Sequence, residues 1–474
     1  MTLRDLIGEG APAVEVSALA YASERVTPGT LFFCVPGLVA DGHDFAREAA
    51  ERGAVALVCE RPLGLAIPEI VVPDARAAMA PAAARFYGDP SSELAVVGVT
   101  GTNGKTTTTF LTRSLLEAAG IGTGLLGTVT SIVGGQAEAG ERTTPEAIDL
   151  AARLRRMADA GDRACVMEVS SHALALGRCE GVHFSCQVFT NLTQDHLDFH
   201  QTMDDYFRAK RRLFGGPGAS IVNIDDHYGR RIADEVEGAV SYAIEVDAEY
   251  RAHDIELDGT GASFRCETPA GALELRTRLP GRFNVYNALA AVAAARVVGV
   301  DLELIGPALA LAEPVRGRFE PVEEGQDFTV IVDYAHSPDS LANALRAARA
   351  LTTGRVHVVF GAGGDRDRAK RPLMGEAARA LADRVIVTSD NPRSEDPDAI
   401  IDEILAGSGE AAERERDRRR AIALAIETAA PADVVLIAGK GHEQGQELAG
   451  GRVEPFDDVA VARAALRRVG GASA

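Results

Sequence analysis

The stretch LAVVGVTGTNGKTTTTFLTRSLLEAAG, residues 94–120, decides the fold of this chain. It opens with an apolar run, 94–100, of the kind that forms a buried strand. A glycine-rich segment, GTNGKTT at 101–107, follows, and the remainder has the pattern of a helix that ends at Gly120. Because a strand, a glycine loop and a helix in this order form part of a βαβ unit, the stretch predicts a parallel sheet with a phosphate-binding loop.

The glycine loop predicts a binding site for ATP. Its backbone N–H groups and the start of the following helix favour a bound phosphate. Lys105 would reach the β- and γ-phosphates, and the Thr106 hydroxyl would bind Mg²⁺. The ordinary P-loop pattern requires a glycine where this chain has Val99, with Gly98 and Gly101 on either side. The expected ATP-binding residues of the loop are Gly101, Thr102, Asn103, Gly104, Lys105, Thr106 and Thr107.

The chain is expected to divide into three α/β domains, with this loop in the central one. Residues 1–92 alternate short apolar runs with turns and end in the breaker segment YGDPSSE. Residues 93–315 form the central domain, with further strands expected at 164–170, 186–192 and 219–225. The pattern of strand and Ala-rich helix restarts in residues 316–474, which predicts a second, doubly wound parallel sheet.

Polar clusters follow the four strands expected in the last domain. They are DYAH at 333–336, GAGGDRD at 361–367, DNPR at 390–393 and GKGHE at 439–443. Ligands of doubly wound sheets bind at the carboxyl ends of strands, so these clusters predict a second ligand site. The basic run RERDRRR, 414–420, is interpreted as a solvated helix face.

The composition bounds the class of protein. The 474 residues are 46% hydrophobic and 25% charged, which is typical of globular domains. A net charge of −20 argues against a general nucleic-acid or membrane-surface binder, although a local basic pocket can still hold an anion. No apolar run reaches the roughly 18–20 residues of a membrane helix, and MTLRDLIGEG is not a signal-peptide pattern. Six scattered cysteines indicate reduced core thiols in a cytoplasmic protein rather than a zinc site.

Lysine usage is the sharpest compositional signal. The 49 basic residues include four lysines: Lys105, Lys210, Lys370 and Lys440. Arginine can replace a solvated lysine, but not a compact ammonium or an amine that must be deprotonated and modified. Each remaining lysine is therefore a candidate functional residue, with survival by chance as the alternative. Lys210 stands out because three neighbouring basic residues are arginines, and carbamylation of its amine would create a metal-binding carboxylate.

Two further side chains follow strands of the central domain and suit a divalent metal. Glu168 ends the expected strand 164–170, and His196 lies after the strand 186–192. A carboxylate and a neutral imidazole facing a phosphate pocket are suitable metal ligands. Either residue alone would more often be a satisfied polar core residue, but both at strand ends favour the metal interpretation.

Motifs spread in order over residues 23–458 resemble those of the Mur ligases. The motifs are GTNGKTT, EVSSHAL, TNLTQDHLD, YFRAKRRLF, GRFNVYNALAA, GRFE, VDYAHSPDSL, GGDRDRAKRP, SDNPRSEDP and GKGHEQGQ. The glycine loop is shared with folylpolyglutamate synthetase. Within the family, the DNPR segment marks enzymes that add meso-diaminopimelate rather than L-lysine. The resemblance implies a central P-loop ATPase domain and a C-terminal Rossmann-like domain.

The resemblance also implies a reaction and its site residues. ATP would phosphorylate the γ-carboxylate of D-glutamate in UDP-MurNAc-L-Ala-D-Glu, and the amine of diaminopimelate would attack the acyl phosphate, in peptidoglycan precursor synthesis. Lys105, Glu168, His196 and Lys210 are the expected catalytic residues. Two Mg²⁺ ions are implied: Thr106 and Glu168 would hold one, and His196 and carbamylated Lys210 the other. Further ATP-site residues are Asn284, Asn287, Arg318 and Asp333. The nucleotide-sugar site would use Ser23, Thr143, Thr144, Ser170 and Arg178, and the diaminopimelate site Arg366, Asp390, Asn391, Pro392, Arg393, Gly439 and Glu443.

Two positions depart from the family pattern in the nucleotide-sugar region. The usual Asp-Ser-Arg is Ala22-Ser23-Glu24 here, and a usual glutamine is Leu176. Three alternatives stay open: the same ligase with L-lysine, a folylpolyglutamate-synthetase-like ligase, or a P-loop switch without ligase activity. Nucleic acid and membrane insertion are not expected, and the chain is expected to be a monomer.

Overall fold

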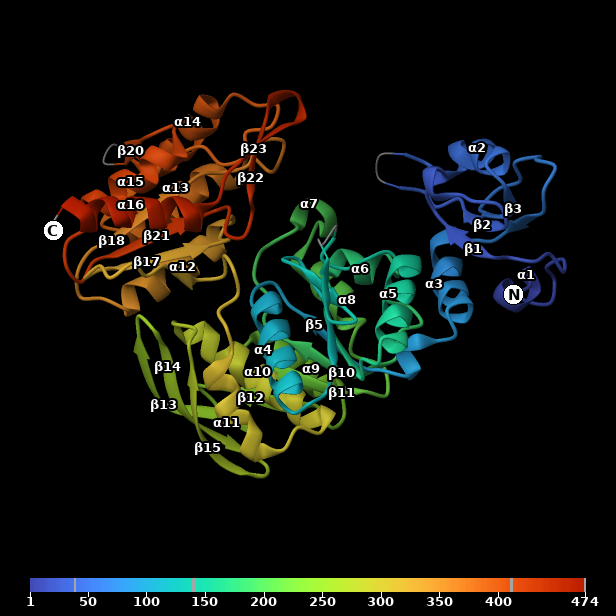
Figure 1. Cartoon of the computed structure of the whole chain (residues 1–474), viewed down its shortest axis with the longest axis horizontal. Coiled ribbons are helices and arrows are strands. Elements are labelled where there is room, and N and C mark those ends of the chain that lie inside the picture. The colour runs from blue at the N-terminus through green and yellow to red at the C-terminus, as the bar shows by residue number, and fades with distance from the viewer. Residues whose placement is uncertain (38–39, 139–141, 410–411, 473–474) are drawn as a thin grey trace.

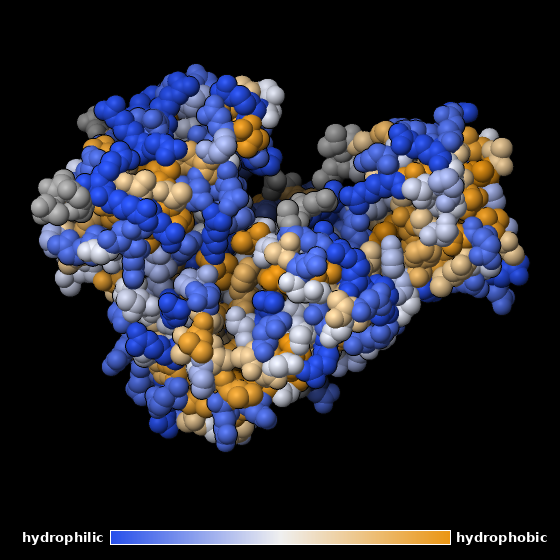
Figure 2. Space-filling model, in the orientation of Figure 1, coloured by the Kyte–Doolittle hydropathy of each residue, from blue (hydrophilic) through white to orange (hydrophobic). Residues whose placement is uncertain are grey.

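Three sheets, each with its own helices, make up the chain. The computed structural model describes residues 1–37, 40–138, 142–409 and 412–472. In Figure 1 the N-terminal domain, in blue, and the C-terminal domain, in orange to red, lie on opposite sides above the central domain. The space-filling view shows a hollow between these two upper domains, over the central one (Figure 2). No described helix has the length and apolar character needed to cross a membrane.

The N-terminal domain is built on a four-stranded parallel sheet in the order β1-β2-β3-β4. Its strands are β1 (Ala18–Ala20), β2 (Thr30–Phe33), β3 (Ala54–Cys59) and β4 (Glu69–Val71). The helices are α1 (Leu3–Ile7), α2 (Ala46–Glu51) and α3 (Ala75–Phe86), with 3-10 turns at Ser23–Arg25, Gly42–Phe45 and Pro90–Ser92. Helix α3 packs against α5 (Ala147–Asp159) of the central domain, and Met79 and Ile148 share one apolar core.

The central domain contains eleven strands among its described residues, in the order β15-β14-β13-β12-β11-β10-β5-β9-β6-β7-β8. The strand expected at 94–100 is β5 (Ala95–Thr100), which lies between the parallel strands β9 (Ala164–Glu168) and β10 (Phe184–Phe189). The other strands are β6 (Thr123–Leu126), β7 (Ser131–Val133), β8 (Gln136–Glu138), β11 (Ala219–Asn223), β12 (Val240–Ala243), β13 (Tyr250–Asp258), β14 (Gly261–Thr268) and β15 (Gly271–Thr277).

Buried helices pack on this central sheet. Helix α4 (Lys105–Ala118) begins directly after the glycine loop, and the Ala-rich α10 (Arg282–Val298) packs against it. Small alanine side chains along α10, buried from Ala288 to Ala295, allow this close approach. The remaining helices are α6 (Ser171–Ala175), α7 (Leu197–His200), α8 (Met203–Arg211), α9 (His227–Glu235) and α11 (Leu302–Leu311).

The C-terminal domain is the doubly wound sheet that the sequence predicted. The strand order is β16-β17-β21-β18-β19-β20, and all neighbours are parallel except β16 with β17. The strands are β16 (Glu320–Pro321), β17 (Thr329–Asp333), β18 (Val356–Phe360), β19 (Arg384–Val387), β20 (Glu413–Arg414) and β21 (Val434–Ala438), with a hairpin of β22 (Gly445–Leu448) and β23 (Arg452–Pro455). Two separate cores, one on each face, contain the helices α12 (Pro338–Ala350), α13 (Lys370–Leu381) and α14 (Pro397–Ser408), and α15 (Arg418–Glu427) and α16 (Asp458–Ala472).

The interpretation of residues 414–420 as a solvated helix face is wrong in one important respect. Helix α15 starts at Arg418, whose side chain is fully buried and forms an ion pair with Asp458 (2.6 Å). The partner lies on α16, far along the chain, so the local charge pattern could not reveal it. By contrast, all six cysteines are buried and unbridged, as predicted for core thiols.

Candidate active site

The glycine loop turns between β5 and α4, and two glycines make the turn possible. Gly101 and Gly104 have positive φ angles of 150° and 86°. A Cβ on Gly101 would lie 1.8 Å from the Thr190 hydroxyl oxygen, and one on Gly104 would lie 2.3 Å from Asn287 Oδ1. No side chain fits at either position, so both must be glycine.

Asn191, which follows β10, braces this loop. Its carbonyl accepts from the Thr102 N–H (2.8 Å), and its side-chain oxygen accepts from the Asn103 N–H (2.9 Å). These two backbone N–H groups are therefore engaged with Asn191. The N–H groups that remain for a phosphate lie at the start of α4, from Gly104 to Thr107, where the helix dipole also favours an anion. Sequence analysis did not single out Asn191, although it lies in the quoted motif TNLTQDHLD.

Two lysines meet under the loop. Lys105 Nζ donates to the carbonyl oxygens of Gly101 (2.9 Å) and Thr102 (2.8 Å), and Lys210 Nζ donates to the same Gly101 oxygen (2.8 Å). Lys210, on α8, is 1% exposed, so it is a core residue and not a solvated surface lysine. Burial, together with the nearby Lys105 charge, holds the pKa of Lys210 well below its usual range. Burial also lowers the pKa of Lys105, while Glu168 and Asp195 act to raise it.

Glu168 ends β9 with a buried carboxylate that faces the loop region. It accepts from the Thr128 N–H (2.8 Å) and hydroxyl (3.1 Å). Its negative charge stabilises the Lys105 ammonium. Because Thr128 fixes its orientation, the buried Glu168 carboxylate is already positioned to bind a cationic or metal-bound ligand.

His196 is in a left-handed conformation (φ 54°) at the start of α7. Its ring contacts that of His172, with 4.8 Å between the centroids. Burial lowers the pKa of His196 to about 4, although the Asp195 charge opposes this, so the imidazole is neutral at pH 7. Among the described residues, His, Cys, Asp and Glu alone form no group of three or more that could hold a metal. A metal at this place would therefore depend on Thr106 and Lys210 as well.

The remaining residues expected at the ATP site come from two domains. On α10, Asn287 Nδ2 donates to Asn284 Oδ1 (2.9 Å), and its own oxygen accepts from Thr108 of α4 (3.3 Å). In the C-terminal domain, the Arg318 guanidinium lies over the Tyr334 ring at 4.6 Å from its centroid. The neighbouring Asp333 accepts from the N–H groups of Phe319 (2.7 Å) and Ala335 (2.8 Å), and burial raises its pKa.

Asp339 joins the C-terminal domain to the loop, a contact that sequence analysis missed. Its Oδ2 accepts from the Thr193 hydroxyl (2.7 Å) and from Asn103 Nδ2 (3.4 Å). Asp339 lies in the first turn of α12, and Asn103 lies in the glycine loop. The glycine loop of the central domain is therefore in direct contact with the start of α12 in the C-terminal domain.

Four of the five residues expected at the nucleotide-sugar site lie together. Thr144 Oγ1 donates to the Glu168 carbonyl (2.9 Å) and accepts from the Ser170 N–H (3.0 Å). Arg178 donates to the Thr144 carbonyl (3.3 Å), and Thr143 Oγ1 lies 3.0 Å from Thr128 Oγ1. Ser23 is separate: it is buried in the N-terminal domain, where its hydroxyl donates to Glu48 (3.0 Å).

A cavity of about 220 Å³ lies between Ser23 and this cluster along the domain boundary. It is lined by Tyr21, Ala22, Glu24, Arg25, Arg142, Pro145, Glu146, Asp149 and Arg153. Three arginines and three acidic residues line it, and two of the arginines are paired within the lining: Arg25 with Asp149 (2.9 Å) and Arg142 with Glu146 (2.8 Å). The departures Ala22 and Glu24 lie in its wall.

The residues expected to bind the amino acid gather at the carboxyl ends of β19 and β21. Asn391 Nδ2 donates to Glu443 Oε2 (2.8 Å), and the Cβ position of Gly439 lies 2.5 Å from Asp390 Oδ2. Gly439 has a φ of 117°, so glycine is required for this close approach. The carbonyl oxygen of Pro392 lies similarly close to Gly364.

Two arginines border this cluster. Arg393 donates from Nε to Glu447 Oε2 (2.5 Å) and from Nη1 to the Gly364 carbonyl (2.8 Å). Arg366 is exposed and donates to the Asp365 carbonyl (3.2 Å). The Cβ position of Gly363 lies 3.1 Å from Arg393 Nη1 and 3.8 Å from Arg366 Cγ, so both arginines flank the same loop.

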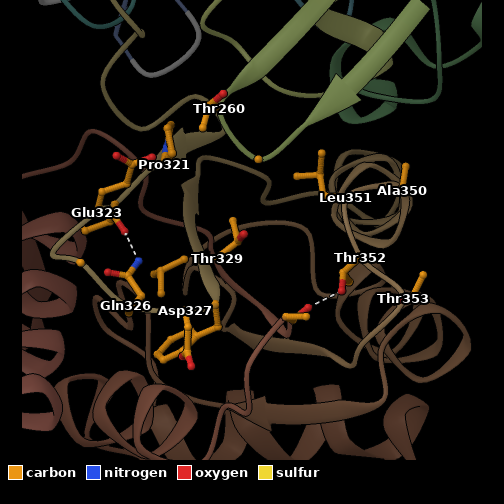
Figure 3. Close-up of a pocket in the computed structure, with 16 residues that line it drawn as sticks. Thr260, Pro321, Glu323, Gln326, Asp327, Thr329, Ala350, Leu351, Thr352 and Thr353 are labelled. Carbon is orange, nitrogen blue, oxygen red and sulfur yellow. Dashed lines mark hydrogen bonds between the residues drawn. The ribbon is translucent and has the colours of Figure 1, made fainter. Parts of the chain in front are cut away.

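A second cavity, of about 700 Å³, is remote from this chemistry. It lies between the β13–β14 turn, at Gly259 and Thr260, and the C-terminal domain (Figure 3). Thr329 begins β17 and Ala432 precedes β21, so the cavity is at the amino ends of these strands. Ligands of doubly wound sheets bind at the opposite edge, and no expected site residue lines this cavity.

Comparison with known proteins agrees with this geometry. Family models match three parts of the chain: "Mur ligase family, catalytic domain" at residues 15–87, "Mur ligase middle domain" at 99–295 and "Mur ligase, glutamate ligase domain" at 317–441. The chain therefore belongs to the Mur ligase family.

Individual relatives show which members of the family the chain resembles. The chain is 49% identical to the UDP-N-acetylmuramoyl-L-alanyl-D-glutamate–2,6-diaminopimelate ligase of Geobacillus thermodenitrificans, over 96% of this chain and 95% of the relative. It is 44% identical to the ligase of the same name from Streptomyces coelicolor, over 99% and 96%. A solved structure of a ligase with this name has a TM-score of 0.72 at 31% identity and covers 99% of both chains. Folylpolyglutamate synthase of Mycobacterium tuberculosis, at 17% identity, TM-score 0.62 and coverage of 82% and 94%, shares the fold alone.

Proposed function

We propose that this chain joins meso-diaminopimelate to the γ-carboxylate of D-glutamate in UDP-MurNAc-L-Ala-D-Glu, with ATP as the energy source. The observation that carries the proposal is the identity of 49% over 96% of the chain to a ligase named for these substrates. The geometry supports it, because the phosphate loop of the central domain faces the C-terminal domain through Asp339.

The reaction has two steps. An oxygen of the γ-carboxylate attacks the γ-phosphorus of ATP, the bond to ADP breaks, and an acyl phosphate forms. The neutral amine of diaminopimelate then attacks the acyl carbon, a tetrahedral intermediate collapses, phosphate leaves, and the nitrogen gives up a proton to form the amide. Negative charge must be stabilised around the transferred phosphoryl group, and we assign this role to Lys105 and the first-turn N–H groups of α4.

The family implies Mg²⁺, and the residues present fit it provided that Lys210 does not carry a positive charge. Thr106 supplies a hydroxyl, Glu168 a buried carboxylate and His196 a neutral imidazole, but Lys210 in its cationic form opposes a metal. Carbamylation replaces that cation by a carboxylate, and the lowered pKa of Lys210 favours the neutral amine that reacts with CO₂. When bound there, Mg²⁺ would neutralise charge on the phosphate oxygens. The chain's own contribution is to hold these four side chains around the loop.

We assign the choice of amino acid to the cluster at the ends of β19 and β21. Diaminopimelate carries a second amino-carboxylate end, whereas lysine lacks the distal carboxylate. The Arg393 guanidinium can bind that carboxylate, and Glu443 can pair with the distal ammonium. Lysine cannot use the first contact, which favours diaminopimelate.

The nucleotide-sugar substrate is proposed to lie along the boundary of the first two domains, from Ser23 to the cluster of Thr143, Thr144, Ser170 and Arg178. The proposed domain limits are 1–92, 93–315 and 316–474. We further propose that the enzyme is cytoplasmic and monomeric.

Release of phosphate from ATP tests the class of activity. With UDP-MurNAc-L-Ala-D-Glu present, phosphate release that depends on added diaminopimelate supports the ligase. Release that is unaffected by any amino acid would instead support a nucleotide-binding switch. A requirement for a folate substrate would support the folylpolyglutamate alternative.

A further inference from the structure

Lys440 is a buried cation at the carboxyl end of β21 that the proposed reaction does not use. Its side chain is 0% exposed, and it is one of the four lysines of the chain. Its Nζ donates to Asn391 Oδ1 (2.8 Å) and to Glu443 Oε2 (3.0 Å), and lies 3.7 Å from Asp390 Oδ1. All three partners belong to the cluster expected to bind the amino acid.

These bonds determine which way the Asn391 amide faces. Its oxygen accepts from Lys440 Nζ and also from the Glu447 N–H (3.0 Å), and its nitrogen donates to Glu443 Oε2 (2.8 Å). The opposite orientation would place the NH₂ group against two donors and the oxygen against a carboxylate. Lys440 therefore fixes the donor side of Asn391 toward Glu443.

Lys440 also orients the Glu443 carboxylate. The Oε2 atom accepts both Lys440 and Asn391, whereas Oε1 has no hydrogen-bond partner among the described residues. Glu443 is 30% exposed, so Oε1 is available to a ligand ammonium. An exposed glutamate without this anchor would sample several rotamers, and a ligand would have to order it on binding.

We propose that Lys440 is a positioning residue for the amino-acid site. Its ammonium anchors Asn391 and Glu443, so that Glu443 presents one oxygen to the distal ammonium of the incoming amino acid. The assignment rests on the proposed function. Arginine is a poor replacement for Lys440, because the three acceptors converge on one nitrogen atom, whereas a guanidinium spreads its donors over a planar fork. This explains why lysine persists here in a chain that otherwise uses arginine.

Steady-state kinetics of Lys440→Gln test the proposal. The KM for diaminopimelate should rise about ten- to a hundredfold, as for loss of a charge-assisted hydrogen bond, while the KM for ATP stays within about threefold. Lys440→Met, which fills the space without an amide to satisfy, is the second variant should Lys440→Gln fail to fold. An equal change in both KM values, or an unchanged KM for diaminopimelate, overturns the proposal.

A matched control lies at the opposite edge of the same sheet. His357, buried at the start of β18, pairs with Asp433 (3.0 Å), which directly precedes β21. His357→Gln should lower the Tm without a selective rise in the KM for diaminopimelate. Failure of the proposed function is separately visible in the wild-type protein. If the wild type joins lysine instead, diaminopimelate is wrong as the substrate. The role of Lys440 is then tested by the KM for lysine in place of that for diaminopimelate.

Discussion

Lys105 and Lys210 donate to the same oxygen atom, the carbonyl of Gly101, at 2.9 and 2.8 Å. Two ammonium groups on one acceptor repel each other strongly in a buried place, which disfavours the charged form of one of them. Lys210 is the more deeply buried, and its pKa is held well below its usual range, so we propose that it is the amine that loses its proton more readily. This relationship supplies the physical reason for a carbamate at Lys210, because a neutral amine is the form that reacts with CO₂.

Substitution of Lys210 tests the carbamate. Lys210→Arg keeps the cation but cannot form a carbamate, so activity should be nearly abolished and added bicarbonate should not restore it. Lys210→Ala should be partly rescued by a short carboxylate supplied in solution. Turnover is measured as phosphate release, and near-normal turnover of the arginine variant would contradict the carbamate role.

Lys105→Ala should reduce kcat/KM by at least about 10²-fold, by analogy with loss of one donor that stabilises transition-state charge. The Lys105 ammonium donates to the carbonyl oxygens of Gly101 and Thr102 and not to the nucleotide-sugar cluster around Thr144, so binding of UDP-MurNAc-L-Ala-D-Glu without ATP should be unchanged. Calorimetry measures that binding. Its loss in the variant would show that the loop does more than hold phosphate.

Arg393→Ala should lower the kcat/KM for diaminopimelate more than the kcat/KM for lysine. The guanidinium is 23% exposed, so loss of its contact should cost about 1.5–3 kcal/mol, roughly ten- to a hundredfold in kcat/KM. Lysine has no distal carboxylate and should lose little. Arg393→Lys should recover part of the preference, because an ammonium cannot reproduce the bidentate fork.

Glu447→Gln is the matched control for Arg393. It removes the charge that pairs with Arg393 (2.5 Å) but leaves the guanidinium in place. The kcat/KM for diaminopimelate should then stay the same or rise. If Arg393→Ala lowered kcat/KM for both amino acids by one factor, Arg393 would be structural or catalytic.

His442 should make the protein less stable in mild acid. Burial and the nearby charges of Arg318 and Arg316 lower its pKa to about 4, against about 6.5 in an unfolded chain. The unfolded state then binds more protons, so the free energy of unfolding falls as the pH drops from about 6.5 through 4. Urea unfolding at pH 7.5 and pH 5 measures this fall, which should be smaller in His442→Gln. An identical fall in both proteins would exclude His442 as a source.

Local patterns were enough to predict much of this structure. The loop 101–107, the strand before it and the doubly wound C-terminal sheet follow from glycine positions and apolar runs that lie within a few residues of each other. The scarcity of lysine pointed to Lys210, which the structure buries against the loop.

Contacts between distant segments could not be predicted in this way. The ion pair of Arg418 with Asp458 joins residues 40 apart, Lys440 and Asn391 are 49 apart, and Thr193 and Asp339 are 146 apart. No periodicity in one segment specifies a partner in another. The family model matches support the three-part organisation, but the role of each site residue stays a prediction.

The mass of the product formed in competition between two amino acids shows directly which one the protein joins. Wild-type protein is incubated with ATP, UDP-MurNAc-L-Ala-D-Glu and equal concentrations of meso-diaminopimelate and L-lysine, and the products are resolved by mass spectrometry. The account predicts an ATP-dependent product that carries diaminopimelate, with little or none that carries lysine. A product that carries mainly lysine, or no amino-acid adduct at all, would contradict it.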